Sequence, residues 1–285
     1  MHHVKINVSN VLKEIYMITE SKDQARKDIR GKVLQAIFAI ILVGIMTSIA
    51  TFALEAINPF PTPEPVMGQN FWEQENAYSQ EYLPGTVFNL VTSLIFSFTV
   101  VSIFTVGLNN FFIRNGQGKE LDVTTSIFYG FKSRYKFILK TFFAVVIAVG
   151  LYFLGIYALM VAGLLVAVTQ PTVAAIISML VLVGAIFAFI KVLDYAFVPY
   201  LLADEEIQLE QPQDYLDMSK TMIKGYKLEL ILLGLSFILW FIASVFTFFL
   251  LLIWLIPYVY QSYANFYLKL KPKPDVVIEE ELATE

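Results

Sequence analysis

Residues 173–202 read VAAIISMLVLVGAIFAFIKVLDYAFVPYLL and contain only two charged side chains, Lys191 and Asp194. About 20 mainly apolar residues in a helix are enough to cross the hydrocarbon core of a bilayer, which is about 30 Å thick. This stretch therefore predicts a membrane-spanning helix. Four similar apolar blocks lie elsewhere in the chain, at 33–54, 85–113, 141–169 and 230–268.

The composition of the whole chain supports the same conclusion. Of the 285 residues, 57% are hydrophobic and 15% are charged, whereas about 25% are charged in an average soluble domain. A soluble domain of this length could not bury so much apolar surface. The chain is therefore expected to be an integral membrane protein, with the lipid bilayer as its first partner. Its net charge of −4 gives no general attraction to nucleic acid.

The last apolar block is too long for one membrane crossing. As a single helix, residues 230–268 would measure about 58 Å, nearly twice the hydrocarbon thickness. We therefore divide the block into two spans joined by a turn near 247–250. The predicted fold class is an all-α polytopic transmembrane helical bundle with six spans, at 33–54, 85–113, 141–169, 173–202, 230–247 and 250–268.

The distribution of basic residues predicts the orientation. Every Lys and Arg except Lys191 lies in one of four segments, 1–32, 114–140, 220–227 and 269–273. The loop at 55–84 has five glutamates, five prolines and no basic residue. Because cytoplasmic loops are enriched in Lys and Arg, we expect both termini in the cytoplasm and the 55–84 loop outside. The predicted location is the bacterial plasma membrane, with a cytoplasmic amphipathic segment at 1–32 and an acidic tail at 269–285.

Three cytoplasmic stretches have the apolar spacing of short amphipathic helices: 8–18, 122–138 and 212–226. Asp122 is a suitable N-cap, and Pro212 suits a first helical turn. A basic amphipathic helix beside a membrane lies among the headgroups or packs under the bundle. Between a structural elbow and a lipid sensor, the elbow is the preferred interpretation.

A degenerate internal repeat is indicated by the residues that lead into the first, third and fifth spans. These read RGKVLQAIF, YGFKSRYKFIL and KGYKLELIL, each with a glycine and a basic residue before the apolar run. We interpret the chain as three units, each a surface helix followed by a hairpin of two spans. Internal repeats are common in transporters, but duplication also produces them in proteins that transport nothing.

Several short motifs in the second half of the chain resemble a known family. In order they are YAFVPYLLAD (195–204), SKTMIKG (219–225), LSFILW (235–240), WLIPY (254–258) and ANFY (264–267). Together with GLNNFFIRNGQGKELDVTTSIFYGFK upstream, they resemble a bacterial family of multi-spanning membrane proteins, "domain of unknown function 975", over roughly residues 105–268. Two sites depart from the family pattern, Glu205-Glu206 and Phe248-Phe249. The resemblance implies a helical fold in the bacterial plasma membrane and implies no activity.

The polar residues of the spans are the candidate site. Lys191 and Asp194 are three residues apart, so they share a helical face and can pair near the cytoplasmic boundary. Charged residues within membrane segments are functional candidates by default. Polar groups at a similar depth come from the second and sixth spans: Asn109, Asn110, Gln261, Tyr263, Asn265 and Tyr267. Two interpretations stay open, a set of packing contacts between helices and a polar vestibule that contacts a substrate.

An enzymatic site is not supported by the sequence. The chain has no cysteine, so disulfides, thiolate metal sites and cysteine nucleophiles are excluded. Its only histidines, His2 and His3, lie at the terminus and are interpreted as incidental. No catalytic or phosphate-cradling motif is present. We therefore expect no enzyme activity, no metal and no cofactor. Because the first apolar run begins only at Val33, we also expect no cleaved signal peptide.

Three functional classes remain. The preferred one is a non-enzymatic accessory or protective membrane protein that acts through its bundle, its surface helices and a membrane or cytoplasmic protein partner. The first alternative is a transporter of small molecules or lipids that uses the vestibule. The second is an immunity-type protein against membrane-active peptides, whose only motivation is the acidic 55–84 loop. The sequence carries no signal of oligomeric state.

Overall fold

The computed structural model describes residues 8–56, 83–132, 134–167 and 169–272, and within these ranges it contains helices and no strand. Residues 57–82 of the predicted outer loop, His2, His3 and the tail from 273 lie outside the described residues.

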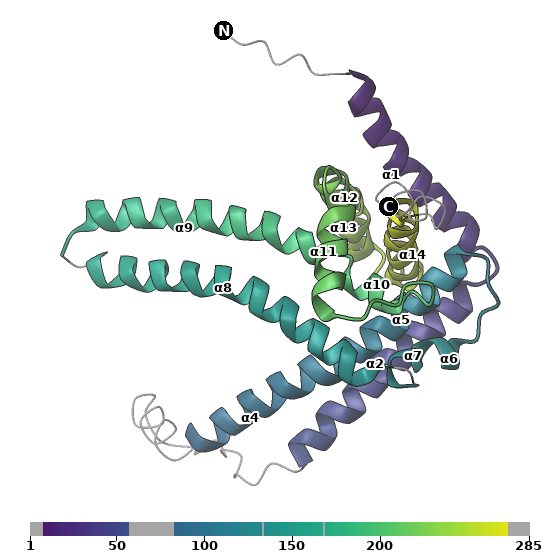
Figure 1. The fold of residues 1–285 in the computed structure, drawn as a ribbon, viewed down its shortest axis with the longest axis horizontal. Helices are drawn as coiled ribbons and strands as arrows, with labels where there is room; N and C mark the ends of the chain where they lie inside the picture. The colour runs from purple at the N-terminus through teal and green to yellow at the C-terminus, as the bar shows by residue number, and fades with distance from the viewer. Residues whose placement is uncertain (1–7, 57–82, 133, 168, 273–285) are drawn as a thin grey trace, which may run out of the picture.

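Long apolar helices extend from the main body of the protein as hairpins (Figure 1). One hairpin is formed by α2 (Val33–Ala56) and α4 (Leu83–Phe96), which continues through the short π-helical turn η1 (Ser97–Val101) into α5 (Ser102–Gly116). A second hairpin is formed by α8 (Tyr135–Ala167) and α9 (Pro171–Val192), which lie side by side.

The remaining helices are shorter than α8 and α9, apart from the N-terminal one, which equals α9 in length. They are α1 (Val8–Ile29), α6 (Val123–Ile127), α7 (Tyr129–Lys132), η2 (Leu193–Tyr195), α10 (Val198–Ala203), α11 (Pro212–Ile223), α12 (Lys227–Leu235), α13 (Ile238–Phe246) and α14 (Leu252–Leu270).

Among the residues that the structure describes, five helical segments are long and apolar enough to cross a membrane: Val33–Ala53, Val87–Gly116, Tyr135–Ala167, Thr172–Ala203 and Lys227–Phe246. They correspond to the first five predicted spans. The sixth predicted span, 250–268, corresponds to α14 and is not among them. Its C-terminal half is rich in polar and aromatic residues, and Gln261, Ser262 and Asn265 are buried in the core.

Local capping explains where two of the short helices begin. Asp122 accepts a hydrogen bond from the Thr124 backbone N–H at 3.1 Å, which confirms it as an N-cap. Pro212 occupies the first turn of α11, as predicted, and the Asp214 side chain accepts from the Gln211 backbone N–H at 3.1 Å. The helix predicted over 122–138 is instead divided into α6, α7 and the first turn of α8.

The chain reverses between α13 and α14 without a glycine. Phe248 and Phe249 both have positive φ angles, 49° and 65°, a conformation that is uncommon for bulky residues. The turn is held by a hydrogen bond from Phe249 N to Ser244 O at 2.8 Å and another from Leu251 N to Thr247 Oγ1 at 3.2 Å.

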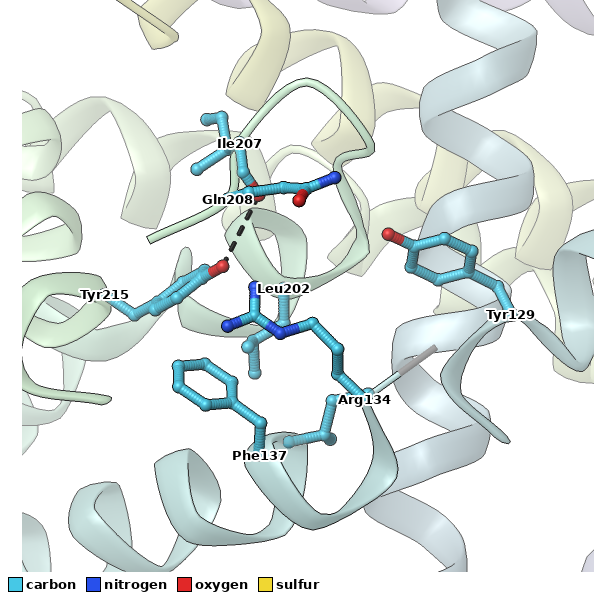
Figure 2. Close-up of a pocket in the computed structure, with 8 residues that line it drawn as sticks. Tyr129, Arg134, Phe137, Leu202, Ile207, Gln208 and Tyr215 are labelled. Atoms are coloured by element: carbon cyan, nitrogen blue, oxygen red, sulfur yellow. Dashed lines mark hydrogen bonds between the residues drawn. The ribbon is translucent and has the colours of Figure 1, made fainter. Parts of the chain in front are cut away.

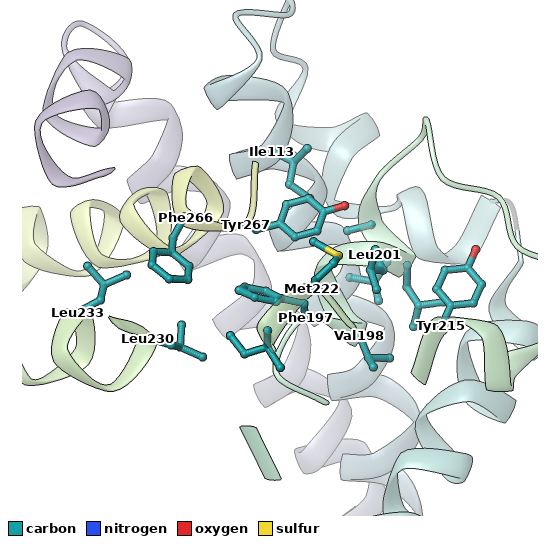
Figure 3. Close-up of a cluster of buried hydrophobic side chains, with 14 of the residues drawn as sticks. Ile113, Phe197, Val198, Leu201, Tyr215, Met222, Leu230, Leu233, Phe266 and Tyr267 are labelled. Carbon is teal, nitrogen blue, oxygen red and sulfur yellow. The ribbon is translucent and has the colours of Figure 1, made fainter. Parts of the chain in front are cut away.

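The buried core lies where the hairpins converge, between α1, α5, α10, α11 and α14. Its centre is a group of packed aromatic rings in which Phe197 contacts both Phe266 and Tyr267 (Figure 3). Helix α5 also approaches α6 closely at Gly107. A Cβ at this position would lie 2.0 Å from the Ile127 carbonyl oxygen, so the close approach requires glycine. The sequence therefore produces a dense helical core with long apolar helices attached to it.

Candidate functional site

Asp194 forms its ion pair with a residue that the sequence did not suggest. Its Oδ1 lies 2.6 Å from Lys227 Nζ, at the start of α12. The Lys191 ammonium instead lies 5.5 Å from the centroid of the Phe187 ring. The expected Lys191–Asp194 pair is therefore not formed. The reason is local, because α9 ends at Val192 and the 3₁₀ turn η2 redirects Asp194 toward α12.

The same turn is tied to α11 through a buried hydroxyl. Ser219 Oγ donates to the Asp194 carbonyl at 2.8 Å and accepts from the Phe197 N–H at 3.2 Å. Asp194 thus connects three elements, η2, α11 and α12, by its backbone and its side chain together.

Asn109 and Asn110 lie on α5 and are 3% and 1% exposed. Asn110 Nδ2 donates to the Ala203 carbonyl at 2.9 Å and to Glu205 Oε1 at 3.3 Å. Arg114 Nη1, one helical turn further on, donates to the same carboxylate at 2.8 Å. Burial raises the pKa of Glu205, but the hydrogen bonds from Arg114 and Asn110 outweigh it and the net pKa is lowered.

Gln261 and Asn265 lie one turn apart on α14 and join it to α5 and α1. Asn115 Nδ2 donates to Gln261 Oε1 at 2.7 Å, and Gln261 Nε2 donates to Asn265 Oδ1 at 3.0 Å. Asn265 Nδ2 in turn donates to Asp28 Oδ2 at 2.7 Å. Lys32 Nζ extends this hydrogen-bond network by donating to Asn115 Oδ1 at 3.0 Å. Burial raises the pKa of Asp28 above its usual value.

Tyr267 and Tyr263 occupy different surroundings although they are one turn apart. The Tyr267 hydroxyl is buried and donates to Asp204 Oδ2 at 2.9 Å. Tyr263 is half-buried, and its hydroxyl would lie 2.9 Å from a Cβ on Gly234. Gly234 therefore allows α12 to pack closely against the Tyr263 side chain.

Asp204 is the most deeply buried carboxylate of the site. It is 1% exposed and lies 2.6 Å from Lys271 Nζ. Lys271 also contacts Glu206 at 2.8 Å, and Lys119 contacts Glu206 at 2.8 Å. The hydrogen bonds from Lys119 and Lys271 lower the pKa of Glu206 to about 2. Glu205 and Glu206, which depart from the family pattern, thus connect α5 to the end of α14.

The structure brings together some predicted residues and separates others. Asn109, Asn110, Gln261, Asn265 and Tyr267 lie in the core between α5, α10 and α14, and each is at most 3% exposed. Lys191 and Asp194 lie elsewhere, at the junction of α9 with α12, and Tyr263 faces α12. The side chains of Asn110, Gln261 and Asn265 donate to backbone carbonyls, carboxylates or each other. This placement favours the packing interpretation over a vestibule.

A cavity that sequence reasoning did not identify lies at the start of α8. Its volume is about 270 Å³, and its lining comes from α7, α8, α10, α11 and the segment between the last two (Figure 2): Tyr129, Arg134, Phe137, Ile138, Leu202, Ile207, Gln208 and Tyr215. In the sequence, Arg134 stands out only as a member of the basic segment 114–140. That segment is the one available signal, since half of the lining, at Leu202, Ile207, Gln208 and Tyr215, is distant from it along the chain.

Arg134 is held in place from two sides. Its Nη2 donates to the Leu209 carbonyl at 3.1 Å, and its guanidinium carbon lies 4.2 Å from the centroid of the Phe137 ring. The Tyr215 hydroxyl accepts from the Leu209 N–H at 3.1 Å and donates to the Ile207 carbonyl at 3.4 Å. Within the described part of the chain, no group of three or more His, Asp and Glu side chains could hold a metal ion.

Comparison with known proteins gives one match. A family model described as "Protein of unknown function (DUF975)" matches residues 16–273. No curated protein and no solved structure matches the chain.

Proposed function

The chain belongs to the family described as "Protein of unknown function (DUF975)", and on this premise we propose that it is a multi-pass protein of the bacterial plasma membrane with a non-enzymatic accessory or protective role. In this proposal the apolar hairpins insert into the bilayer. The helical core lies at the cytoplasmic surface and offers its exposed helices to a protein partner.

The contrast between the core and the hairpins supports this proposal. In the most apolar stretch of α8, 0% of the residues are buried. In the corresponding stretch of α9 and α10, 11% of the residues are buried. Large side chains such as Leu164 and Met179 are 74% and 70% exposed. Exposed apolar surface on this scale suits lipid contact. The predicted polar residues of α5 and α14 are packed inside the core instead, and this arrangement gives a transport pathway less support than a structural role.

The positions of basic residues support a cytoplasmic core. Lys32, Arg114, Arg134 and Lys227 all lie where a hairpin helix meets the core. Since Lys and Arg are enriched on the cytoplasmic side of membrane segments, we place the core and both termini in the cytoplasm.

The third hairpin, α12–α14, differs from the other two because a charged helix packs along it. In α1, Lys22 Nζ donates to Ser236 Oγ at 2.9 Å and lies 4.5 Å from the Phe237 ring centroid. Next to it on α1, the side chains of Asp23 and Arg26 are 53% and 54% exposed. Charged side chains with this exposure belong in water, so Phe237 marks a level outside the hydrocarbon.

The hairpin beyond Phe237 is short. Helix α13 has 9 residues, or about 14 Å, which is about half of the hydrocarbon thickness. We therefore propose that the α13–α14 hairpin enters one leaflet with its apolar turn at 247–251 and does not cross. Four helices then cross completely, in place of the six spans inferred from sequence, and both termini stay on one side.

The order of elements also supports the proposed repeat. Each hairpin is preceded by a separate helical segment: α1 before α2–α4, α6 and α7 before α8–α9, and α11 before α12–α14. This order agrees with three units that each combine a surface helix with a membrane hairpin.

Cysteine accessibility tests the proposed function, because the chain has no cysteine of its own. Single cysteines replace Asn109, Asn110 and Asn265, with Lys136 as an exposed control, and a membrane-impermeant maleimide is added from the cytoplasmic side. We expect rapid labelling at 136 and labelling at the other three only after denaturation. Rapid labelling at all three core positions would instead support a water-filled vestibule and a transporter.

A further inference from the structure

We propose that the cavity at the start of α8 binds the phosphate group of a lipid headgroup through Arg134. This inference rests on the membrane insertion proposed above. It adds a defined ligand class to a protein for which the family supplies none.

The position of the cavity fits a headgroup. Arg134 immediately precedes α8, whose apolar surface begins within its first turns and is exposed over most of its length. The cavity therefore lies at the boundary between the core and a membrane helix, where lipid phosphates are located. Exposed Lys136 and Lys140 on the first two turns of α8 add positive charge to the same region.

The charge of Arg134 is not neutralised within the described part of the chain. None of the ion pairs among the described residues includes it. Arg114 is a useful contrast, because its guanidinium binds Glu205 at 2.8 Å. Arg134 uses Nη2 for the Leu209 carbonyl, and a guanidinium has five N–H donors in a planar fork that suits phosphate.

The walls of the cavity divide into a polar and an apolar part. Figure 2 shows the Arg134 side chain between Tyr129 and Tyr215, with its guanidinium on the Tyr215 side, and Gln208 also lines the cavity. Ile138 and Leu202 supply buried apolar surface to the same lining. The volume of about 270 Å³ lies just below the range of about 300–1,000 Å³ for drug-sized ligands. A phosphate with its glycerol fits this description better than a complete lipid.

A matched pair of variants separates the cavity from general electrostatic attraction. Arg134→Gln removes the guanidinium, and Lys136→Gln removes an equal charge two residues away and outside the cavity. Binding of dihexanoyl phosphatidylglycerol and of inorganic phosphate is measured calorimetrically on the full chain in neutral detergent. We expect Arg134→Gln to weaken phosphatidylglycerol binding about tenfold or more and Lys136→Gln to weaken it by less than about threefold.

Two results would overturn the proposal. An equal loss in both variants would show diffuse attraction, and equally tight binding of inorganic phosphate would rule out the lipid headgroup as the preferred source. Because Arg134→Gln could disturb the Leu209 segment, Gln208→Glu provides a second variant. It places a negative charge at the exposed edge of the cavity and should weaken lipid binding as well.

Membrane retention after an alkaline wash distinguishes this inference from the proposed function. A chain that stays in the membrane without binding the short-chain lipid overturns only the phosphate site. A wild-type chain that leaves the membrane overturns the proposed membrane role itself.

Discussion

The ammonium of Lys271 lies 2.6 Å from the carboxylate of Asp204, which is 1% exposed. This contact fastens the end of α14 to the segment that follows α10. The Tyr267 hydroxyl donates to the same carboxylate at 2.9 Å. One buried acid therefore binds two side chains, Tyr267 from α14 and Lys271 from the C-cap of that helix.

Replacement of Asp204 should be strongly destabilising. Asp204→Ala leaves the Tyr267 hydroxyl and much of the Lys271 charge without their buried partner, so we expect a loss of about 3–5 kcal/mol in the free energy of unfolding. Asp217→Ala is the matched control, because its pair with Lys220 is exposed and should contribute about 0–1 kcal/mol. Thermal unfolding in detergent compares the two, and equal losses would contradict the buried role of Asp204.

A double-mutant cycle should identify the true partner of Asp194. The structure predicts a coupling energy of about 1–3 kcal/mol between Asp194→Asn and Lys227→Met, because their charges are in contact and partly buried. The corresponding cycle with Lys191→Met should give a coupling near zero. Coupling to Lys191 that exceeds coupling to Lys227 would support the pairing inferred from sequence instead.

Gly107 should tolerate no side chain. A Cβ there would lie 2.0 Å from the Ile127 carbonyl oxygen, so Gly107→Ala must push α5 away from α6 at a cost of about 1–3 kcal/mol. Gly44→Ala on α2 is the control, since nothing lies within 4 Å of its Cβ position. That change should be neutral or should stabilise the helix by up to about 1 kcal/mol. The same thermal-unfolding measurement tests both.

Acid should weaken the contacts of Glu206. Its pKa is lowered from 4.5 to about 2 by Lys119 and Lys271, so its ionised form favours the folded state. This contribution is complete above about pH 4.5 and is lost as the pH falls toward 2. We expect the wild-type unfolding temperature to fall more steeply across this range than that of Glu206→Gln, whereas exposed Glu210→Gln should follow the wild type. Parallel curves for wild type and Glu206→Gln would contradict the assignment.

The depth of the third hairpin can be measured at its turn. A single cysteine replacing Phe248, which is 89% exposed, should be unreactive toward an impermeant maleimide added from either side, because the proposed position is inside the bilayer. A cysteine replacing Gln24 of α1 should react only from the cytoplasmic side. Rapid labelling of position 248 from the outside would show that α13 and α14 cross completely.

The sequence by itself predicted the helical class, the apolar hairpins and the family. Whether a helix such as α8 or α9 is apolar and long enough to cross a membrane depends on local composition over about 20 residues, which can be counted along the chain. The N-cap at Asp122 and the first turn at Pro212 were predictable for the same reason, since capping involves residues only two or three positions apart.

Only the tertiary structure decided the partners of the polar groups. Asp194 binds Lys227 because η2 ends the helical register that would have joined it to Lys191. The C-terminal half of α14 resembles an amphipathic span in sequence, yet α1 and α5 bury its amides and hydroxyls. Arg134 lines a cavity together with residues as distant along the chain as Tyr215. Local patterns carry no information on such contacts, because burial and pairing depend on which distant segments the fold brings together.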